Sequence, residues 1–119
     1  REENIAKGAF RFAEWEYIET ELNKLLDQLK SEKYLAELPK EQLAKRLAYY
    51  LSELNVLHPF REGNGRTNRE FIRQLALKNG YVLNLAKVSP KETLEASIIS
   101  IVDTEKLENI IQECLEEKQ

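Results

Sequence analysis

Two amphipathic helical patterns that flank one glycine-containing turn constrain this chain more than any other feature. Before the turn, apolar residues recur at steps of three and four over residues 40–57, and Pro59 ends that pattern. After the turn, a second pattern runs over residues 67–79, and Gly80 stands where a glycine commonly ends a helix. The sequence therefore predicts two packed helices joined by the turn at residues 58–66.

The turn itself concentrates residues that suit a polyphosphate. Gly63 and Gly65 bracket Asn64, so the backbone can take positive φ and aim successive N–H groups to one side. The next helix adds its own N-terminal N–H groups to the same place. Arg66 and Arg69 are three residues apart, hence on one helical face, and each offers a planar fork of donors for phosphate oxygens.

Two further side chains add chemistry to the turn. Glu62 could hold Mg²⁺, which is commonly shared between one or two carboxylates and the phosphates of a substrate. His58, the only histidine, could take a proton from an incoming hydroxyl near neutral pH. Each feature is weak alone, because a histidine at a helix end is more often a cap. Their coincidence indicates a base, a metal ligand and a phosphate cradle in one segment.

Residues 58–69, with the sequence HPFREGNGRTNR, match H-P-F-x-[D/E]-G-N-G-R-x-x-R at every defined position. The chain thereby resembles the Fic (filamentation induced by cAMP) family. Its members are mostly protein adenylyltransferases (AMPylators), which move AMP from ATP to a Tyr, Thr or Ser hydroxyl of a target protein and release pyrophosphate. The resemblance implies an all-α fold, a Fic-type helical bundle with a small β-hairpin flap. It also implies Mg²⁺ as cofactor and ATP as substrate.

The first half of the motif resembles the catalytic part of that family. His58 looks like the general base for the target hydroxyl, and Glu62 looks like the Mg²⁺ ligand. Phe60 resembles the apolar anchor that holds the loop on the core.

The second half of the motif resembles the family's nucleotide site. Gly63, Asn64 and Gly65 look like the anion hole for the α- and β-phosphates. Arg66 resembles a β/γ-phosphate contact, and Arg69 resembles the γ-phosphate clamp. These implied roles agree with the residues' own chemistry, because phosphoryl-type transfer depends mainly on positioning and charge neutralisation.

A second candidate region lies near the start of the chain. Residues 4–12 carry two short extended runs around a glycine, which is a weak hairpin signal. In Fic proteins a β-hairpin flap ahead of the motif pairs with an extended segment of the target, and this region resembles it. The target-docking candidates, which would bind by β-augmentation, are Lys7, Gly8, Ala9, Phe10, Arg11 and Phe12. The alternative is that Phe10 and Phe12 only pin a loop onto the core.

Three further helices are expected around the helix–turn–helix unit. Apolar steps of three and four predict one over residues 17–30. Residues 89–92, Ser-Pro-Lys-Glu, form a capping box that opens another, and residues 81–88 before it should be extended or irregular. Asp103 is a candidate N-cap for a last helix over residues 105–117.

Composition limits the classes of function. A net charge of −3 and a pI near 5.4 argue against a nucleic-acid partner. A single cysteine, Cys114, excludes an internal disulfide and fits a reducing compartment. No apolar run approaches the roughly 18 residues of a membrane span, and no signal peptide opens the chain. We therefore expect no membrane partner and a cytoplasmic protein, in the producer cell or delivered into a host or competitor cell.

The 119 residues are expected to form one soluble domain, since no repeat or low-complexity segment marks a boundary. The chain begins at Arg1 and contains no methionine. We therefore expect residues 1–119 to be the C-terminal part of a single Fic domain whose N-terminal helices are missing from this chain.

Inhibition has several alternatives. Many Fic proteins are silenced by an [S/T]-x-x-x-E-[G/N] helix, and residues 104–109, TEKLEN, fit that pattern, with Glu108 as the glutamate. The pattern also begins where Asp103 would cap an ordinary structural helix. The first alternative is that this segment is an intramolecular inhibitory helix. If it is instead a structural helix, inhibition comes from the missing N-terminal portion, from a separate antitoxin of a toxin pair, or does not occur.

The function has alternatives as well. Within the superfamily these are transfer of phosphate or phosphocholine and removal of AMP. Residues 63–66 favour adenylylation, because Doc-type kinases depart from this quartet in the anion hole. A different class of function is a catalytically silent peptide-binding module. The intact base, metal ligand and arginines count against it.

Overall fold

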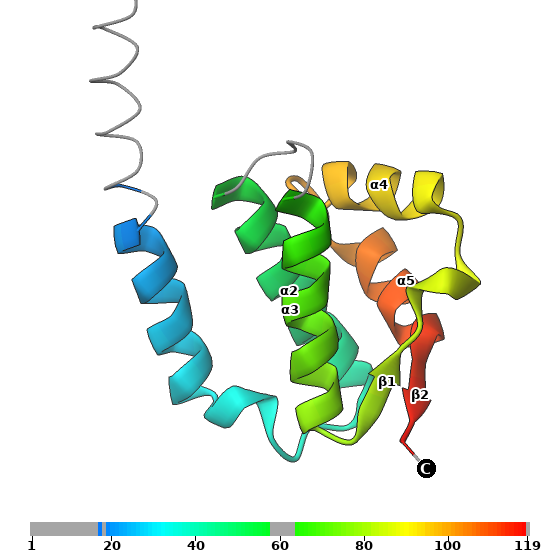
Figure 1. Ribbon diagram of the computed structural model, residues 1–119, viewed down its shortest axis with the longest axis horizontal. Helices are drawn as coiled ribbons and strands as arrows, with labels where there is room; N and C mark the ends of the chain where they lie inside the picture. Colours follow the sequence, from blue (N-terminus) through cyan, green and yellow to red (C-terminus); the bar gives the residue numbers. More distant parts are fainter. Residues whose placement is uncertain (1–16, 18, 58–63, 119) are drawn as a thin grey trace, which may run out of the picture.

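The computed structural model describes residues 17, 19–57 and 64–118. Apart from one short sheet, this part of the chain is built mainly of helices (Figure 1). The first helix covers residues 19–31, close to the predicted range. The later elements are η1 (Lys33–Leu35), α2 (Lys40–Leu57), α3 (Asn64–Lys78), β1 (Tyr81–Leu83), η2 (Leu85–Lys87), α4 (Pro90–Ile99), α5 (Glu105–Cys114) and β2 (Leu115–Glu117). The predicted all-α fold class is confirmed. The predicted β-hairpin flap at residues 7–12 lies outside the described residues, and the sheet of β1 and β2 was not predicted.

Helix α2 is the centre of the molecule. It has the predicted bounds and packs against α3, α4 and α5. The first helix lies along another of its sides, where Leu25 and Leu29 are buried (Figure 1). The buried residues of α2 are Leu43, Ala44, Leu47, Ala48, Tyr50, Leu51, Ser52, Leu54 and Asn55. Because α2 is covered on several sides, its position sets that of the helices around it.

The two strands join distant parts of the chain. β1 follows α3 directly and pairs antiparallel with β2, with Tyr81 opposite Glu117 and Leu83 opposite Leu115. Gly80, at φ +84°, makes the turn between α3 and β1, as predicted for a glycine that ends a helix. The prediction of a helix over residues 105–117 was wrong in its last turn. There, pairing with β1 replaces the helical hydrogen bonds, and periodicity cannot reveal such long-range pairing.

Helix α4 begins as the sequence predicted. The side chain of Ser89 accepts a hydrogen bond from the backbone N–H of Glu92 at 3.2 Å, and Pro90 occupies the first turn. The helix is attached to α2 by a buried pair of hydroxyls, in which Ser100 Oγ donates to Ser52 Oγ at 3.1 Å. Ser52 Oγ in turn donates to the backbone oxygen of Ser100 at 3.1 Å. Small and polar residues therefore form the inner side of this helix.

The connector between the first helix and α2 is tied to the end of α3. Its backbone takes positive φ at Lys33, Tyr34 and Leu35, and Leu35 is buried in the core. Asn79 Nδ2 donates to the Tyr34 backbone oxygen at 2.9 Å. The Lys78 ammonium lies 4.2 Å from the centre of the Tyr34 ring, within the range of a cation–π contact. Tertiary contacts thus hold a backbone conformation that these residues rarely adopt.

Candidate functional site

The described residues include the second half of the predicted phosphate turn. Asn64, Gly65, Arg66 and Arg69 all belong to α3. Outside the described residues lie the other predicted site residues, namely His58, Phe60, Glu62, Gly63 and the docking candidates of residues 7–12. Their roles stay predictions.

Helix α3 starts three residues earlier than the sequence suggested, at Asn64 instead of Thr67. Glycine disfavours a helix interior, so Gly65 led to a prediction that was too short. The first turn is therefore built from Asn64, Gly65 and Arg66. The first four N–H groups of an α-helix have no partner inside the helix, and the macrodipole is positive there. Donors and positive potential thus converge on the predicted phosphate site.

The charges of this first turn are the reverse of what helix stability favours. It contains no acidic residue, although acidic side chains stabilise a helix N-terminus. It contains Arg66 instead, and Arg69 follows one turn later. Local rules of this kind are commonly broken at functional sites, and a bound anion would reverse the unfavourable charge balance.

The two motif arginines differ from the other described arginines in their partners. Arg46 pairs with Glu32, and Arg73 pairs with Glu70 at 2.7 Å. In residues 17, 19–57 and 64–118, neither Arg66 nor Arg69 takes part in an ion pair. Arg66 is exposed and Arg69 is half-buried. Within the described part of the chain, neither guanidinium group is therefore paired with a carboxylate.

One of the two residues between these arginines, Asn68, faces the protein interior. Asn68 is buried against α2, where its Nδ2 donates to Asn55 Oδ1 at 3.0 Å. Neither asparagine is among the site residues predicted from the sequence. A signal was present, because Asn68 stands four and seven residues before Ile72 and Leu75, in the buried stripe of α3.

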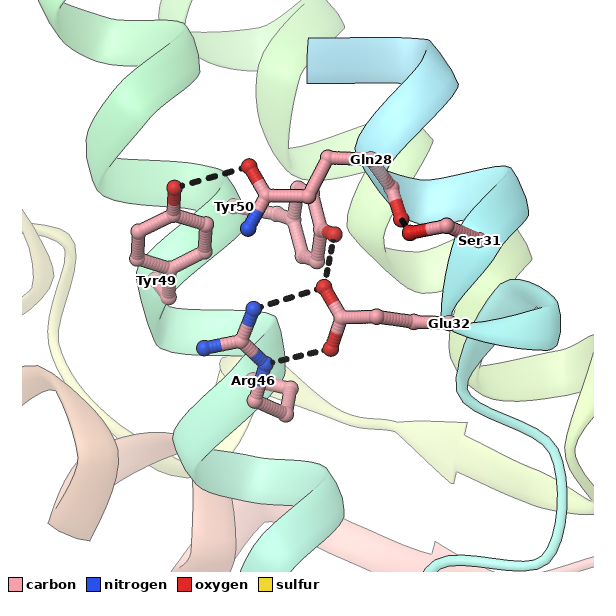
Figure 2. A network of polar contacts seen from close by, with 6 residues as sticks. All are labelled: Gln28, Ser31, Glu32, Arg46, Tyr49 and Tyr50. Atoms are coloured by element: carbon pink, nitrogen blue, oxygen red, sulfur yellow. Dashed lines mark hydrogen bonds and ion pairs between the residues drawn. The ribbon is translucent and has the colours of Figure 1, made fainter.

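A charged network holds the first helix on α2 (Figure 2). Arg46 donates from Nε and Nη2 to the two carboxylate oxygens of Glu32, at 2.8 and 2.6 Å. The Tyr50 hydroxyl donates to the same carboxylate, and the Tyr49 hydroxyl donates to Gln28 at 3.0 Å. Since Tyr50 lies on α2 two turns before residue 58, the network fixes the part of α2 that leads to the motif.

The network shifts the pKa values of its members. Hydrogen bonds from Arg46, and then from Tyr50, lower the pKa of Glu32 below its ordinary value despite partial burial. Burial first, and then the Glu32 carboxylate, raise the pKa of the Tyr50 hydroxyl well above its ordinary value. The charged carboxylate and the neutral phenol therefore persist across the physiological pH range.

Helix α5 carries the segment that resembles an inhibitory motif. Thr104 Oγ1 donates to Glu108 Oε2 at 2.5 Å, so the glutamate is held in the first turn of its own helix. The inner side of α5 is buried at Leu107, Ile110 and Ile111 in the core beside α2. No ion pair joins Glu108 to Arg69 in the described part of the chain. These observations favour the structural-helix alternative.

Comparison with known proteins identifies the family. A sequence model of the Fic/DOC family matches residues 1–76, more than half of the chain. The chain belongs to the Fic/DOC family. It is 44% identical over 97 residues to "Protein adenylyltransferase VbhT" of Bartonella schoenbuchensis, and the aligned region covers 82% of this chain and 20% of that protein. It is 40% identical over 118 residues to "Probable protein adenylyltransferase Fic" of Salmonella typhimurium, covering 98% of this chain and 59% of that protein.

Solved structures agree with this assignment. The N-terminal Fic domain of a VirB-translocated Bep effector protein from Bartonella quintana, solved with bound ADP, superposes with a TM-score of 0.80 at 28% identity. The match covers 86% of this Fic/DOC chain and 49% of that one. The chain therefore spans about half of the solved relative and between 20% and 59% of the two curated relatives.

In the described residues, no helix combines the length and the apolar character that crossing a bilayer requires.

Proposed function

We propose that this chain provides the nucleotide site of a protein adenylyltransferase, which transfers AMP from Mg-ATP to a Tyr, Thr or Ser hydroxyl of a target protein. The observation that carries the proposal is the start of α3. There, a helical first turn without an acidic residue coincides with two arginines, Arg66 and Arg69, that have no acidic partner among the described residues. The names of the relatives and the ADP bound to the Bartonella quintana domain support it.

The phosphate chain of ATP would lie across the first turn of α3. We assign the α- and β-phosphates to the backbone N–H groups of Gly63, Asn64 and Gly65. Arg66 would contact the β- and γ-phosphates, and Arg69 would hold the γ-phosphate. Such fixed donors stabilise the charge that develops on the phosphates during transfer.

His58 is the proposed base. Its imidazole would take the proton of the target hydroxyl, whose oxygen then bonds to the α-phosphorus while the bond to the pyrophosphate oxygen breaks. Mg²⁺, when bound, would neutralise charge on the phosphates, and Glu62 is its proposed ligand. Phe60 would anchor the loop on the core.

We propose residues 7–12 as the docking strand for an extended segment of the target protein, and the cytoplasm of the producer or of a recipient cell as the place of action. Supply of Mg-ATP and the free, buried thiol of Cys114 suit that compartment. The packing of α5 favours inhibition by a separate antitoxin or another part of the protein over inhibition by Glu108.

The deciding experiment incubates the full-length protein with a cell lysate and either α-labelled or γ-labelled ATP. We expect protein labelling from the α-phosphate alone. Labelling from the γ-phosphate alone would instead indicate a kinase, and labelling from neither would indicate a silent binding module or an inhibited state.

Two variants separate the proposed roles. His58→Ala should abolish labelling and leave ATP affinity, measured by calorimetry, largely intact. Arg69→Ala should weaken binding of ATP more than binding of ADP, because only ATP carries the γ-phosphate. Activity of the histidine variant comparable with wild type would remove the base assignment, and equal losses for the two nucleotides would remove the clamp.

A further inference from the structure

The buried side of α3 changes character at the end nearest the motif. Farther along the helix, its buried residues are the apolar Ile72, Leu75 and Ala76. At the first position of the same stripe stands an amide, Asn68, and its partner on α2 is another amide, Asn55. The α2–α3 interface thus has an apolar body and a polar end close to the start of α3.

This pair is deeply buried and well formed. Asn55 is 4% exposed, Asn68 is 5% exposed, and 3.0 Å separates the donor nitrogen from the acceptor oxygen. Both residues are close in sequence to proposed site residues. Asn55 precedes His58 by three residues in the sequence, and Asn68 lies between Arg66 and Arg69. A movement at this pair would therefore move both arms of the site.

Amide pairs and apolar contacts constrain an interface differently. Apolar side chains of similar size tolerate sliding and rotation with small losses, because burial of apolar surface has no preferred direction. A buried amide must keep its partner, since any shift that separates the two leaves an unpaired polar group in the core. A single buried polar pair can for this reason select one register between two helices.

We propose that Asn55 and Asn68 are positioning residues, whose hydrogen bond fixes the rotation and height of α3 on α2 and so sets Arg66 and Arg69 relative to His58. The inference rests on the proposed function of the turn. Neither asparagine touches substrate in this account. Their effect is on the arrangement of groups that do, where displacement by about 1 Å can cost about 100-fold in rate.

The test separates positioning from stability. Asn68→Leu strands the amide of Asn55 in the core, so both the melting temperature and the rate of AMP transfer should fall. The double variant Asn55→Leu, Asn68→Leu replaces the pair by apolar groups, so the melting temperature should recover. Transfer of α-labelled AMP to lysate protein should not recover, and we expect kcat to stay about tenfold or more below wild type.

A matched control removes a different buried polar pair from the same helix. Ser52→Ala, Ser100→Ala deletes the hydroxyl pair that attaches α2 to the end of α4. It should lower the melting temperature and leave kcat within about twofold of wild type, because the α2–α3 register is untouched. If kcat falls in proportion to the melting temperature in all variants, both polar pairs contribute only to stability, and the inference is overturned.

Binding of Mg-ATP, measured by calorimetry, supplies a readout that does not depend on transfer. We expect the double asparagine variant to bind ATP about tenfold more weakly, since two arginines of the site are displaced together. Wild-type affinity and wild-type kcat at a restored melting temperature would overturn the inference. If the wild-type protein binds ATP but labels no protein, the proposed function fails. The ATP affinities of wild type and the double asparagine variant still decide the inference in that case.

Asn68→Gln covers the case in which the double variant folds poorly. This variant keeps an amide donor on a longer side chain, so its rate of AMP transfer should stay within about threefold of wild type. That rate should exceed the rate of Asn68→Leu when both variants are folded. Equal loss in the glutamine and leucine variants would show that the amide hydrogen bond has no positioning role.

Discussion

Helix α2 makes two polar junctions that differ in charge and depth. Toward the first helix, Glu32 and Arg46 form an ion pair whose side chains are 27% and 32% exposed. Toward α3, Asn55 and Asn68 form a neutral pair that is almost completely buried. The charged junction is solvated enough to avoid most of the desolvation penalty, whereas only a neutral pair is tolerated at the depth of the other.

The difference indicates a division of roles. The guanidinium of Arg46 makes a bidentate pair with Glu32 and lies 4.4 Å from the centre of the Tyr49 ring and 5.5 Å from that of Tyr50. Bidentate, ring-stacked pairs of this kind contribute to stability and respond to pH. The asparagine pair has no titratable group and lies close to the start of α3. One junction should therefore govern stability, and the other should govern geometry.

The largest expected effect comes from removing the central ring of the charged junction. Tyr50 is 1% exposed, so Tyr50→Ala should lower the free energy of unfolding by about 3–5 kcal/mol through the cavity it leaves. Tyr50→Phe keeps the ring and loses only the hydrogen bond to the charged Glu32 carboxylate, at a cost of about 1.5–3 kcal/mol. Urea unfolding measures both. Equal losses in the two variants would show that the hydroxyl, not the packed ring, holds this junction.

A smaller effect, with a defined pH dependence, is expected for Glu32→Gln. Because the folded state lowers the pKa of Glu32 below the ordinary 4.5, the carboxylate stabilises the fold above that pH. Its contribution is lost as pH falls through the lowered pKa. The free energy of unfolding of wild type should exceed that of the variant by about 1–3 kcal/mol at pH 7, and this difference should become smaller below pH 4.5. A gap that is constant down to strongly acidic pH would contradict the assigned charge.

The same measurement on the asparagine pair sharpens the comparison. The difference between wild type and Asn68→Leu should not change over this pH range, since neither amide titrates. A pH-dependent difference there would mean that the two junctions are coupled through α2.

Sequence reasoning was accurate where the signal is local. The bounds of α2, the capping box at Ser89 and the helix-ending Gly80 all depend on residues within one or two turns. The fold class followed from such local signals and was supported by the motif resemblance. Arg66 and Arg69, which form no ion pair with another described residue, also agree with the chemistry assigned to the motif.

Sequence reasoning failed where the determinant is distant along the chain. Residues 115–117 read as the end of a helix, because nothing near them reveals that β1 pairs with them. The pairing of Asn55 with Asn68 was missed for the same reason, since an asparagine in an amphipathic pattern gives no indication of its partner. The roles of His58 and Glu62 are still predictions, because both residues lie outside the described part of the chain.

The smallest effect is expected at an exposed pair that resembles the Glu32 junction in geometry only. Hydrogen bonds from Arg73, and then from Gln74, lower the pKa of Glu70 to about 2. The group is fully exposed, however, and solvent and salt screen exposed pairs so strongly that many contribute nothing measurable. Glu70→Gln should therefore leave the urea midpoint of unfolding almost unchanged. If Glu70→Gln destabilised as much as Glu32→Gln, burial would not be what separates the two pairs. The contrast between the junctions of α2 would then need a different physical basis.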